Sequence, residues 1–255
     1  MRLDPLLVPD WRDASAYEAL LEADRCAFAW EWLRRDPSYR AAAYAALGGN
    51  SAAGAGVSRP EDWGLYAFER PHRPTPRARP MWTRTVHPQV LTAQAVQLPP
   101  TDFDLTRFAA NATLLVGSGG ERLLLSDGLR FIRIDLSAGT LRKGPRRLRF
   151  LLDNSEGVDA AILALRRFIV LRQTGAFSRE LHGPGPRGRR LQLLLRTADA
   201  IARGASQREI AEALLVPREM PAAWRDELPT VRMQVRRLVR GAAQMQAGGY
   251  RSLLL

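Results

Sequence analysis

The chain has 255 residues, which is long enough for one large domain or two of ordinary size. Its 46% hydrophobic and 25% charged residues are typical of soluble globular proteins and argue against wholesale disorder or a fibrous repeat. The longest apolar run, residues 41–47, is far shorter than the ~20 residues of a membrane helix, and no signal segment precedes Asp10. We therefore expect a cytoplasmic protein without a membrane partner.

Metal and disulfide chemistry have little support in the sequence. Cys26 is the only cysteine, which excludes an internal disulfide and every zinc pattern built on several cysteines. The three histidines, His72, His87 and His182, are too far apart in sequence for their spacing to indicate a metal site. We predict neither a metal nor a cofactor.

The charge is concentrated at one end of the chain. The formal net charge is +12, and residues 1–80, 81–160 and 161–255 contribute 0, +2 and +10 respectively. A one-sided basic region favours a polyanionic partner, such as the phosphate backbone of a nucleic acid. GC-rich codons can explain why nearly all the basic residues are arginine, but they do not explain the deficit of acids after residue 160.

The first part of the chain has helical spacing of its apolar residues, from about 14 to 35 and again from 39 to 47. Seven of the seventeen prolines then fall between residues 70 and 100, a density that argues against a helix or a central strand. We expect a helical module over 1–69, followed by an extended, proline-rich connector over 70–111.

Short apolar runs separated by turn residues follow the connector. Four such runs between residues 112 and 154, with Asp127-Gly128 as a favoured hairpin dipeptide, predict a small antiparallel β-meander. Helical periodicity returns from 155 to 255, with segments near 158–173, 191–203, 207–215 and 230–247. The predicted fold class is α+β, with a basic helical domain at the C-terminus.

A helix-turn-helix signal lies within this basic domain. Gly204 supplies a permissive backbone between two helical segments, and Ser206 with Glu209 is a capping box that starts the second one. Ser206, Gln207 and Arg208 then stand at the start of that second helix, where a DNA-binding helix-turn-helix makes its contacts. The connection to the following helix, residues 216–229, is longer than the three or four residues of a compact motif.

The last helix divides into an apolar stripe and a basic face. Arginine can form two hydrogen bonds to guanine, and glutamine can do the same to adenine, so the polar residues of this helix are candidates for base and phosphate contacts. Solvated surface arginines are the alternative. The predicted DNA-binding residues are Ser206, Gln207, Arg208, Arg232, Gln234, Arg236, Arg237 and Arg240.

Several motifs resemble known families. Gly-Ala-Ser-Gln-Arg-Glu-Ile-Ala (204–211), Trp224, Val-Arg-Arg-Leu-Val-Arg (235–240) and Gly-Gly-Tyr-Arg-Ser-Leu-Leu (248–254) resemble the RovC-like transcription-factor DNA-binding domain of proteobacteria. That family is linked to activation of type VI secretion genes and of excision functions in integrative conjugative elements. The segments 10–12, 28–37 and 39–40 resemble a transcriptional-regulator-like domain. The resemblance implies an activator that forms homo-oligomers and whose N-terminal domain contacts other proteins.

Two alternatives remain open. The aromatic residues of the N-terminal module are either core or a partner surface, and Trp30 and Trp32 lie about 200° apart on a helix, so we expect one of them to be exposed as an anchor. The chain as a whole is either a sequence-specific DNA-binding regulator or a protein-interaction module whose basic helices bind an acidic protein or RNA. Gly117–Gly120 lacks the following helix of a dinucleotide fold, and we predict no catalytic residue and no enzyme activity. The charge asymmetry predicts that residues 155–255 alone bind DNA.

Overall fold

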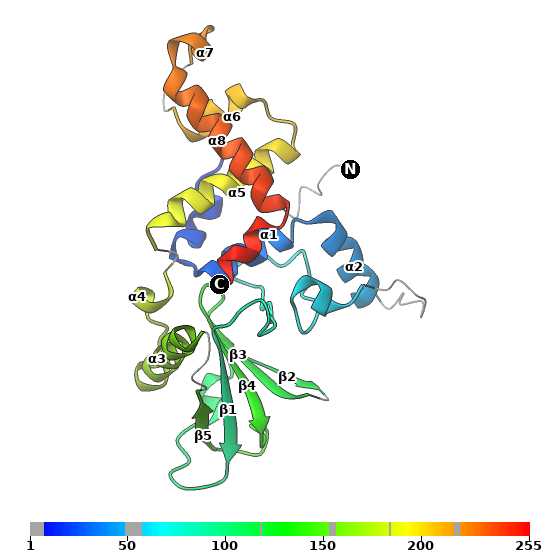
Figure 1. The fold of residues 1–255 in the computed structure, drawn as a ribbon, viewed down its shortest axis with the longest axis vertical. Coiled ribbons are helices and arrows are strands. Elements are labelled where there is room, and N and C mark those ends of the chain that lie inside the picture. The colour runs from blue at the N-terminus through cyan, green and yellow to red at the C-terminus, as the bar shows by residue number, and fades with distance from the viewer. Residues whose placement is uncertain (1–7, 49–57, 118, 153–156, 184, 217–219) are drawn as a thin grey trace. The chain divides into compact units, whose positions relative to one another are not determined.

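A computed structural model describes residues 8–48, 58–117, 119–152, 157–183, 185–216 and 220–255 (Figure 1). The chain forms two compact units, each built from separate stretches of sequence. We call them the helical unit (residues 1–52, 70–75 and 183–253) and the sheet unit (residues 53–69, 76–182 and 254–255). Helices together with a sheet confirm the predicted α+β class.

The helical unit joins the two ends of the chain. Its N-terminal part has a 3₁₀-helix, Ser15–Glu22, and the helices α1 (Arg25–Leu33) and α2 (Pro37–Leu47). Its C-terminal part has α5 (Gly188–Ala202), α6 (Gln207–Leu214), α7 (Trp224–Glu227) and α8 (Pro229–Gln246), flanked by short 3₁₀ turns at Gly185–Arg187 and Gly249–Leu253.

The helix predicted over 14–35 is interrupted at Ala23 and Asp24. Asp24 has extended backbone angles, and its carboxylate accepts a hydrogen bond from the Ala27 amide, so it is the N-cap of α1. Asp36 caps α2 in the same way, by accepting hydrogen bonds from the amides of Ser38 and Tyr39. These two caps fix where the buried helix α1 begins and where its successor starts.

The sheet unit is a five-stranded mixed sheet with a helix on one face. Its strands lie in the order β2-β3-β4-β1-β5; β1 is parallel to β4, and every other pair is antiparallel. The strands are β1 (Val90–Val96), β2 (Ala112–Gly117), β3 (Gly120–Ser126), β4 (Phe131–Ala138) and β5 (Arg147–Leu151). The helices are α3 (Val158–Thr174) and α4 (Arg179–His182), with 3₁₀ turns at Pro60–Trp63 and Leu105–Phe108.

The meander prediction was right for β2, β3 and β4 and wrong in treating the sheet as purely antiparallel. The segment expected to be a connector, 70–111, contains β1, which lies between β4 and β5 as a central strand. The prolines permit this because none falls between Pro88 and Pro99, so every residue of β1 can donate its amide to the ladder. Parallel strands such as β1 and β4 are not joined by a tight turn, so no turn residues in the sequence indicate that they pair.

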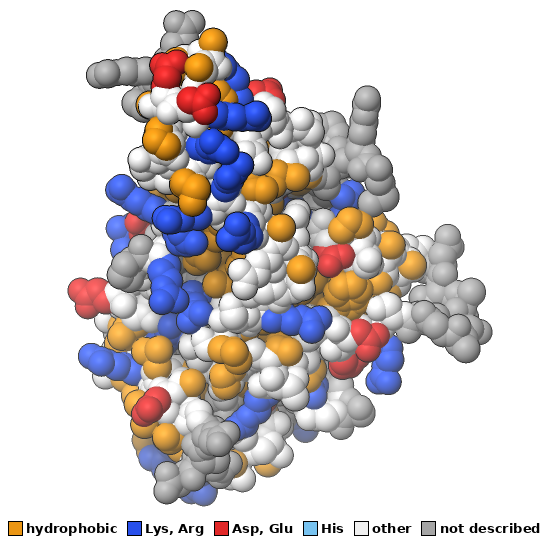
Figure 2. Space-filling model, turned by 45° about the horizontal axis from the view of Figure 1, so that its top comes forward, with side chains coloured by type: hydrophobic (Ala, Val, Ile, Leu, Met, Phe, Trp, Pro, Cys, Tyr) orange, Lys and Arg blue, Asp and Glu red, His pale blue; other side chains and the backbone are white. Residues whose placement is uncertain are grey.

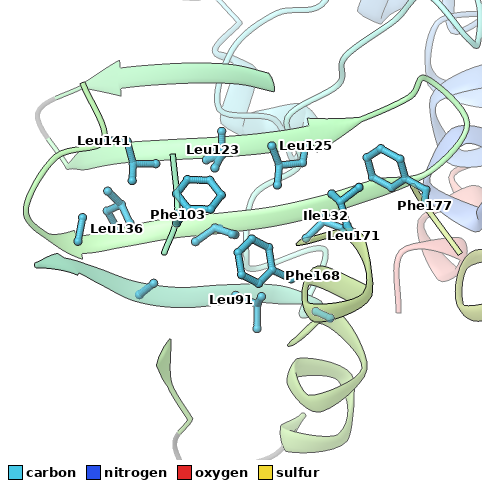
Figure 3. Packing of buried hydrophobic residues seen from close by; sticks show 14 residues of the cluster. Leu91, Phe103, Leu123, Leu125, Ile132, Leu136, Leu141, Phe168, Leu171 and Phe177 are labelled. Carbon is cyan, nitrogen blue, oxygen red and sulfur yellow. The ribbon is translucent and has the colours of Figure 1, made fainter. Parts of the chain in front are cut away.

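The core of the sheet unit lies between the sheet and α3. Phe168 of α3 packs 5.7 Å from Phe103 and 5.2 Å from Phe150 of β5, measured between ring centroids. Figure 3 shows the apolar side chains of β1, β3 and β4 gathered on the side of the sheet where α3 lies. Because α3 completes this core, the compact unit extends past the boundary that the sequence predicted at 154/155.

Among the described residues, no helix is both long and apolar enough to cross a membrane.

Candidate nucleic-acid interface

Helix α8 has a buried stripe and a basic solvent face. Val235, Leu238 and Ala242 are buried, and the sequence of α8 contains no aspartate or glutamate. At about 100° per residue, its four arginines cover roughly 140° of the side turned away from that stripe. The arginines are Arg232, Arg236, Arg237 and Arg240, of which the last three are exposed and the first is half-buried.

Within the described part of the chain, none of these four guanidinium groups forms an ion pair with a carboxylate. In Figure 2, where the top of Figure 1 comes forward, blue side chains follow the region of α8, and red ones gather at its outer end near α7. The positive charge of this face is therefore available to an external anion.

Gln234 is exposed and lies at one edge of the arginine face, one turn before Arg237 and far from Arg236. It is two residues from Arg236, so the two side chains point roughly 160° apart around the helix. A helix in a groove presents one face to the bases, so Gln234 and Arg236 cannot read the same base edges.

A short turn joins α5 and α6. Four residues connect the helices, and Gly204 has a φ of 77°, a left-handed conformation that favours glycine. The capping box is present: the Ser206 hydroxyl accepts a hydrogen bond from the Glu209 amide (3.2 Å), and the Ser206 amide donates to the Glu209 carboxylate (2.8 Å). Ser206 and Gln207 stand exposed at the start of α6.

The half-exposed Arg208 side chain is held by hydrogen bonds within the protein. Its guanidinium donates to Glu212 (2.9 Å) and to the backbone carbonyls of Met220 (2.8 Å) and Pro221 (3.2 Å). The two Nη atoms thereby fasten the segment before α7 to α6, and Nε bonds Glu212 within α6. A contact between Arg208 and DNA would cost these hydrogen bonds.

The long connection between α6 and α8 contributes to the core. Trp224 of α7 is 4% exposed and belongs to an apolar cluster that also takes residues from α6, α8 and the N-terminal segment. Residues 217–219 of the predicted 216–229 insertion lie outside the described residues. The buried members of the cluster are Trp11, Ala200, Ile210, Ala211, Met220, Trp224 and Val235.

Helices α5 and α8 pack closely at a glycine. A Cβ atom on Gly241 would lie 2.7 Å from Cδ2 of Leu194, so the Leu194 side chain of α5 packs directly against the backbone of α8. Arg190 is exposed one turn before Leu194 on α5, as Arg240 is beside Gly241 on α8.

A buried ionic network positions α5 against the N-terminal helices. Arg35 donates from Nε (2.7 Å) and Nη2 (2.9 Å) to the two carboxylate oxygens of Asp199 in α5, and the Tyr17 hydroxyl donates to the same carboxylate (2.7 Å). Glu31 accepts hydrogen bonds from the Arg34 Nε (2.7 Å) and the Thr75 amide (2.7 Å). Every buried charge in this network has a partner.

Burial and the neighbouring charges shift the pKa values of three groups in this network. Burial alone would raise the pKa of Glu31, but the neighbouring Arg34 and Arg35 outweigh it and lower that pKa to about 2. For Arg35, burial alone would lower the pKa, but the carboxylates of Asp199 and Glu31 outweigh it and raise the pKa. Burial and the Asp199 charge raise the pKa of Tyr17, which stays a neutral donor.

Trp30 and Trp32 are both buried, with 0% and 3% of their surface exposed, so the expectation that one of them is a surface anchor was wrong. Helix α1 is enclosed on all sides, and the Trp30 indole donates to the Arg73 carbonyl (3.0 Å) and packs edge-on against Tyr39. The nearly unbroken apolar run from Cys26 to Leu33 was the available signal, since a helix that is apolar all round is a buried one.

The family comparisons identify both ends of the chain. Residues 153–255 match the model of a family described as "T6SS, Transcription factor, DNA binding domain", the RovC DNA-binding domain. Residues 10–66 match a proteobacterial transcriptional regulator-like domain. No curated protein and no solved structure matches the chain.

Proposed function

We propose that this transcriptional regulator, which carries a proteobacterial regulator-like domain and a RovC-type DNA-binding domain, binds duplex DNA through the arginine face of α8. The observation that carries the proposal is the solvent face of α8, where four arginines stand without a single acidic residue in the helix. Such a face can neutralise phosphates along a groove, and its arginines can reach the edges of guanine.

Charge favours α8 over α6 as the helix that enters the groove. In the usual helix-turn-helix the helix after the turn takes this role, and here that helix is α6. However, α6 carries Glu209 and Glu212 against one arginine, Arg208, which is occupied by internal hydrogen bonds. We propose that the exposed Ser206 and Gln207 at the start of α6 contact the backbone, while α8 reads the bases.

We propose that the regulator is an activator without catalytic activity. The resemblance of its motifs to regulators of type VI secretion genes supports the first part. Homo-oligomers and a protein partner of the N-terminal domain stay predictions, and burial removes Trp30 and Trp32 as anchors for such a partner. A reporter gene placed behind a bound promoter should respond with increased transcription when the protein is supplied.

The test is selection of genomic DNA fragments by the purified full-length protein and by a variant with Arg236→Ala and Arg237→Ala. The wild type should enrich one sequence motif, and the variant should lose it. The matched control, Arg59→Gln with Arg77→Gln, removes the same charge from exposed positions in the sheet unit and should keep the motif. Retention of a specific acidic protein or RNA with no enriched DNA motif would favour the interaction-module alternative.

A further inference from the structure

One face of the sheet packs on α3, and the opposite face carries several arginines beside buried residues such as Leu124 and Arg133. On β5, Leu148 and Phe150 pack on the core against α3. Because side chains alternate along a strand, Arg147 and Arg149 lie on the opposite face. Their cross-strand neighbours on β1 are Val96 and Gln94.

The same face carries further arginines on the inner strands. Arg122 of β3 pairs across the ladder with Asp135 of β4, which in turn pairs with Thr92 of β1, so these three residues form one row across the sheet. The Arg84 guanidinium donates to the Thr92 hydroxyl and so lies over this row. Three steps between strands at ~4.8 Å place Arg122 roughly 14 Å from β5. We call Arg84, Arg122, Arg147 and Arg149 the sheet arginines.

Among the described strand residues, Asp135 is the only acid on this face, and its charge is already paired. Asp135 accepts a hydrogen bond from Arg133 (2.6 Å), a buried arginine, and another from the Tyr66 hydroxyl (3.3 Å). Glu121 of β3 alternates with Arg122 and lies on the other face, where it accepts from the Leu141 amide. The sheet arginines therefore carry an excess of positive charge.

None of the sheet arginines has a carboxylate partner in the part of the chain that the structure describes. Arg147 and Arg149 form no ion pair, Arg84 is bound to a hydroxyl, and Arg122 stacks 4.0 Å from the centre of the Tyr66 ring. Like charges gathered on one sheet face repel one another, and the negative charge of a bound polyanion would offset this repulsion.

We propose that the sheet arginines are a second DNA contact, which binds backbone phosphates of duplex DNA. The inference rests on the proposed function for the choice of duplex DNA as the ligand. Duplex DNA offers one phosphate per ~1.7 Å of its axis, so a face with arginines spread over roughly 14 Å meets several phosphates. Phosphate contacts of this kind supply affinity and not sequence selection.

The test uses the full-length protein and a random-sequence duplex, with binding measured across a salt series. Replacing Arg147→Gln and Arg149→Gln should weaken binding and reduce the slope of log affinity against log salt by about 2, since each phosphate contact contributes ~0.9. The Arg147→Lys, Arg149→Lys variant keeps the charge and should retain most of the slope. The Arg59→Gln, Arg77→Gln control should behave as the wild type.

Each outcome supports or overturns the proposal. Equal slopes for the Gln variant and the control would overturn it, as would a wild-type protein that binds no duplex. If the Gln variant were put through the genomic-fragment selection and lost the enriched motif, the assignment of these arginines to phosphates would be overturned. If the Gln variant has the lower slope while the α8 variant Arg236→Ala, Arg237→Ala binds normally, the proposed function fails and the sheet contact stands.

Discussion

Arg35 and Asp199 form a bidentate ion pair in the interior of the helical unit, with side chains 6% and 2% exposed. Arg35 belongs to the regulator-like domain, matched at residues 10–66, and Asp199 to the DNA-binding domain, matched at 153–255. The two family domains thus share one buried charge network. The orientation of α5 depends on side chains supplied from more than 160 residues away in the sequence.

Removing one member of this pair should cost much stability. Arg35→Met leaves the Asp199 carboxylate buried without its partner, a change that typically lowers the free energy of unfolding by about 3–5 kcal/mol. Urea denaturation of the full-length protein measures the loss. The control is Arg12→Met, which removes a 3.0 Å ion pair to Glu209 at the surface and should have little effect. Equal effects of the two substitutions would contradict the structural role of Arg35.

The shared network changes what is expected of a C-terminal fragment. A chain of residues 153–255 lacks Trp11, which belongs to the apolar cluster around Trp224, and lacks Tyr17 and Arg35, which satisfy Asp199. We expect this fragment to unfold without cooperativity and to bind DNA more weakly than the full chain, despite its net charge. Circular dichroism and urea titration test this, and a cooperative transition with full-length affinity would refute it.

Arg208 and Arg240 should separate stability from DNA binding. Arg208→Ala removes the hydrogen bonds to the Met220 and Pro221 carbonyls and should lower the free energy of unfolding by about 1 kcal/mol. It should leave the salt dependence of DNA binding unchanged. Arg240→Ala should reduce the salt slope by about 1 while the unfolding transition stays in place. A lower salt slope for Arg208→Ala together with an unchanged slope for Arg240→Ala would exclude α8 as the interface.

Two buried histidines should make the sheet unit sensitive to acid. Burial lowers the pKa of His87, whose Nδ1 is 2.8 Å from the Leu254 carbonyl, and that of His182 to about 4 from the ordinary 6.5. As the pH falls from 6.5 to 4, the unfolded chain takes up these protons and the folded protein does not. Stability is therefore lost over that window, by at most about 1.4 kcal/mol per pH unit for each histidine.

Urea unfolding at a series of pH values between 7 and 4 measures this loss. His87→Gln keeps a hydrogen-bond donor but does not titrate, so it should remove part of the pH dependence. His72→Gln is the matched control, because His72 is exposed and should leave the pH profile unchanged. A wild-type profile that is flat between pH 6.5 and 4 would contradict the burial of both groups.

The correctly predicted helices rest on signals between residues that are close in sequence. The boundaries of α5, α6 and α8 follow from Gly204, from the Ser206–Glu209 box and from apolar spacing, all of which act within a few residues. What could not be predicted is non-local. The parallel pairing of β1 with β4 and the Arg35–Asp199 ion pair join segments distant in sequence, and no local pattern encodes such partners.

The candidate site shows the same division. The arginine face of α8 was readable because both its stripe and its charges lie on one helix. The role of Arg208 was not, because its partners, Met220 and Pro221, come from a segment with no regular pattern. The alternation of Arg147 and Arg149 with Leu148 and Phe150 was visible, but which strand lies at the open edge of the sheet was not.

The most direct test is the salt dependence of binding to the selected DNA motif by the wild type and by the Arg236→Ala, Arg237→Ala variant. If α8 binds the duplex, the variant should lose affinity and its slope of log affinity against log salt should be lower by about 2. The urea transition of the variant should match the wild type, because both side chains are exposed. Identical affinity and slope in the two proteins would show that DNA is bound elsewhere.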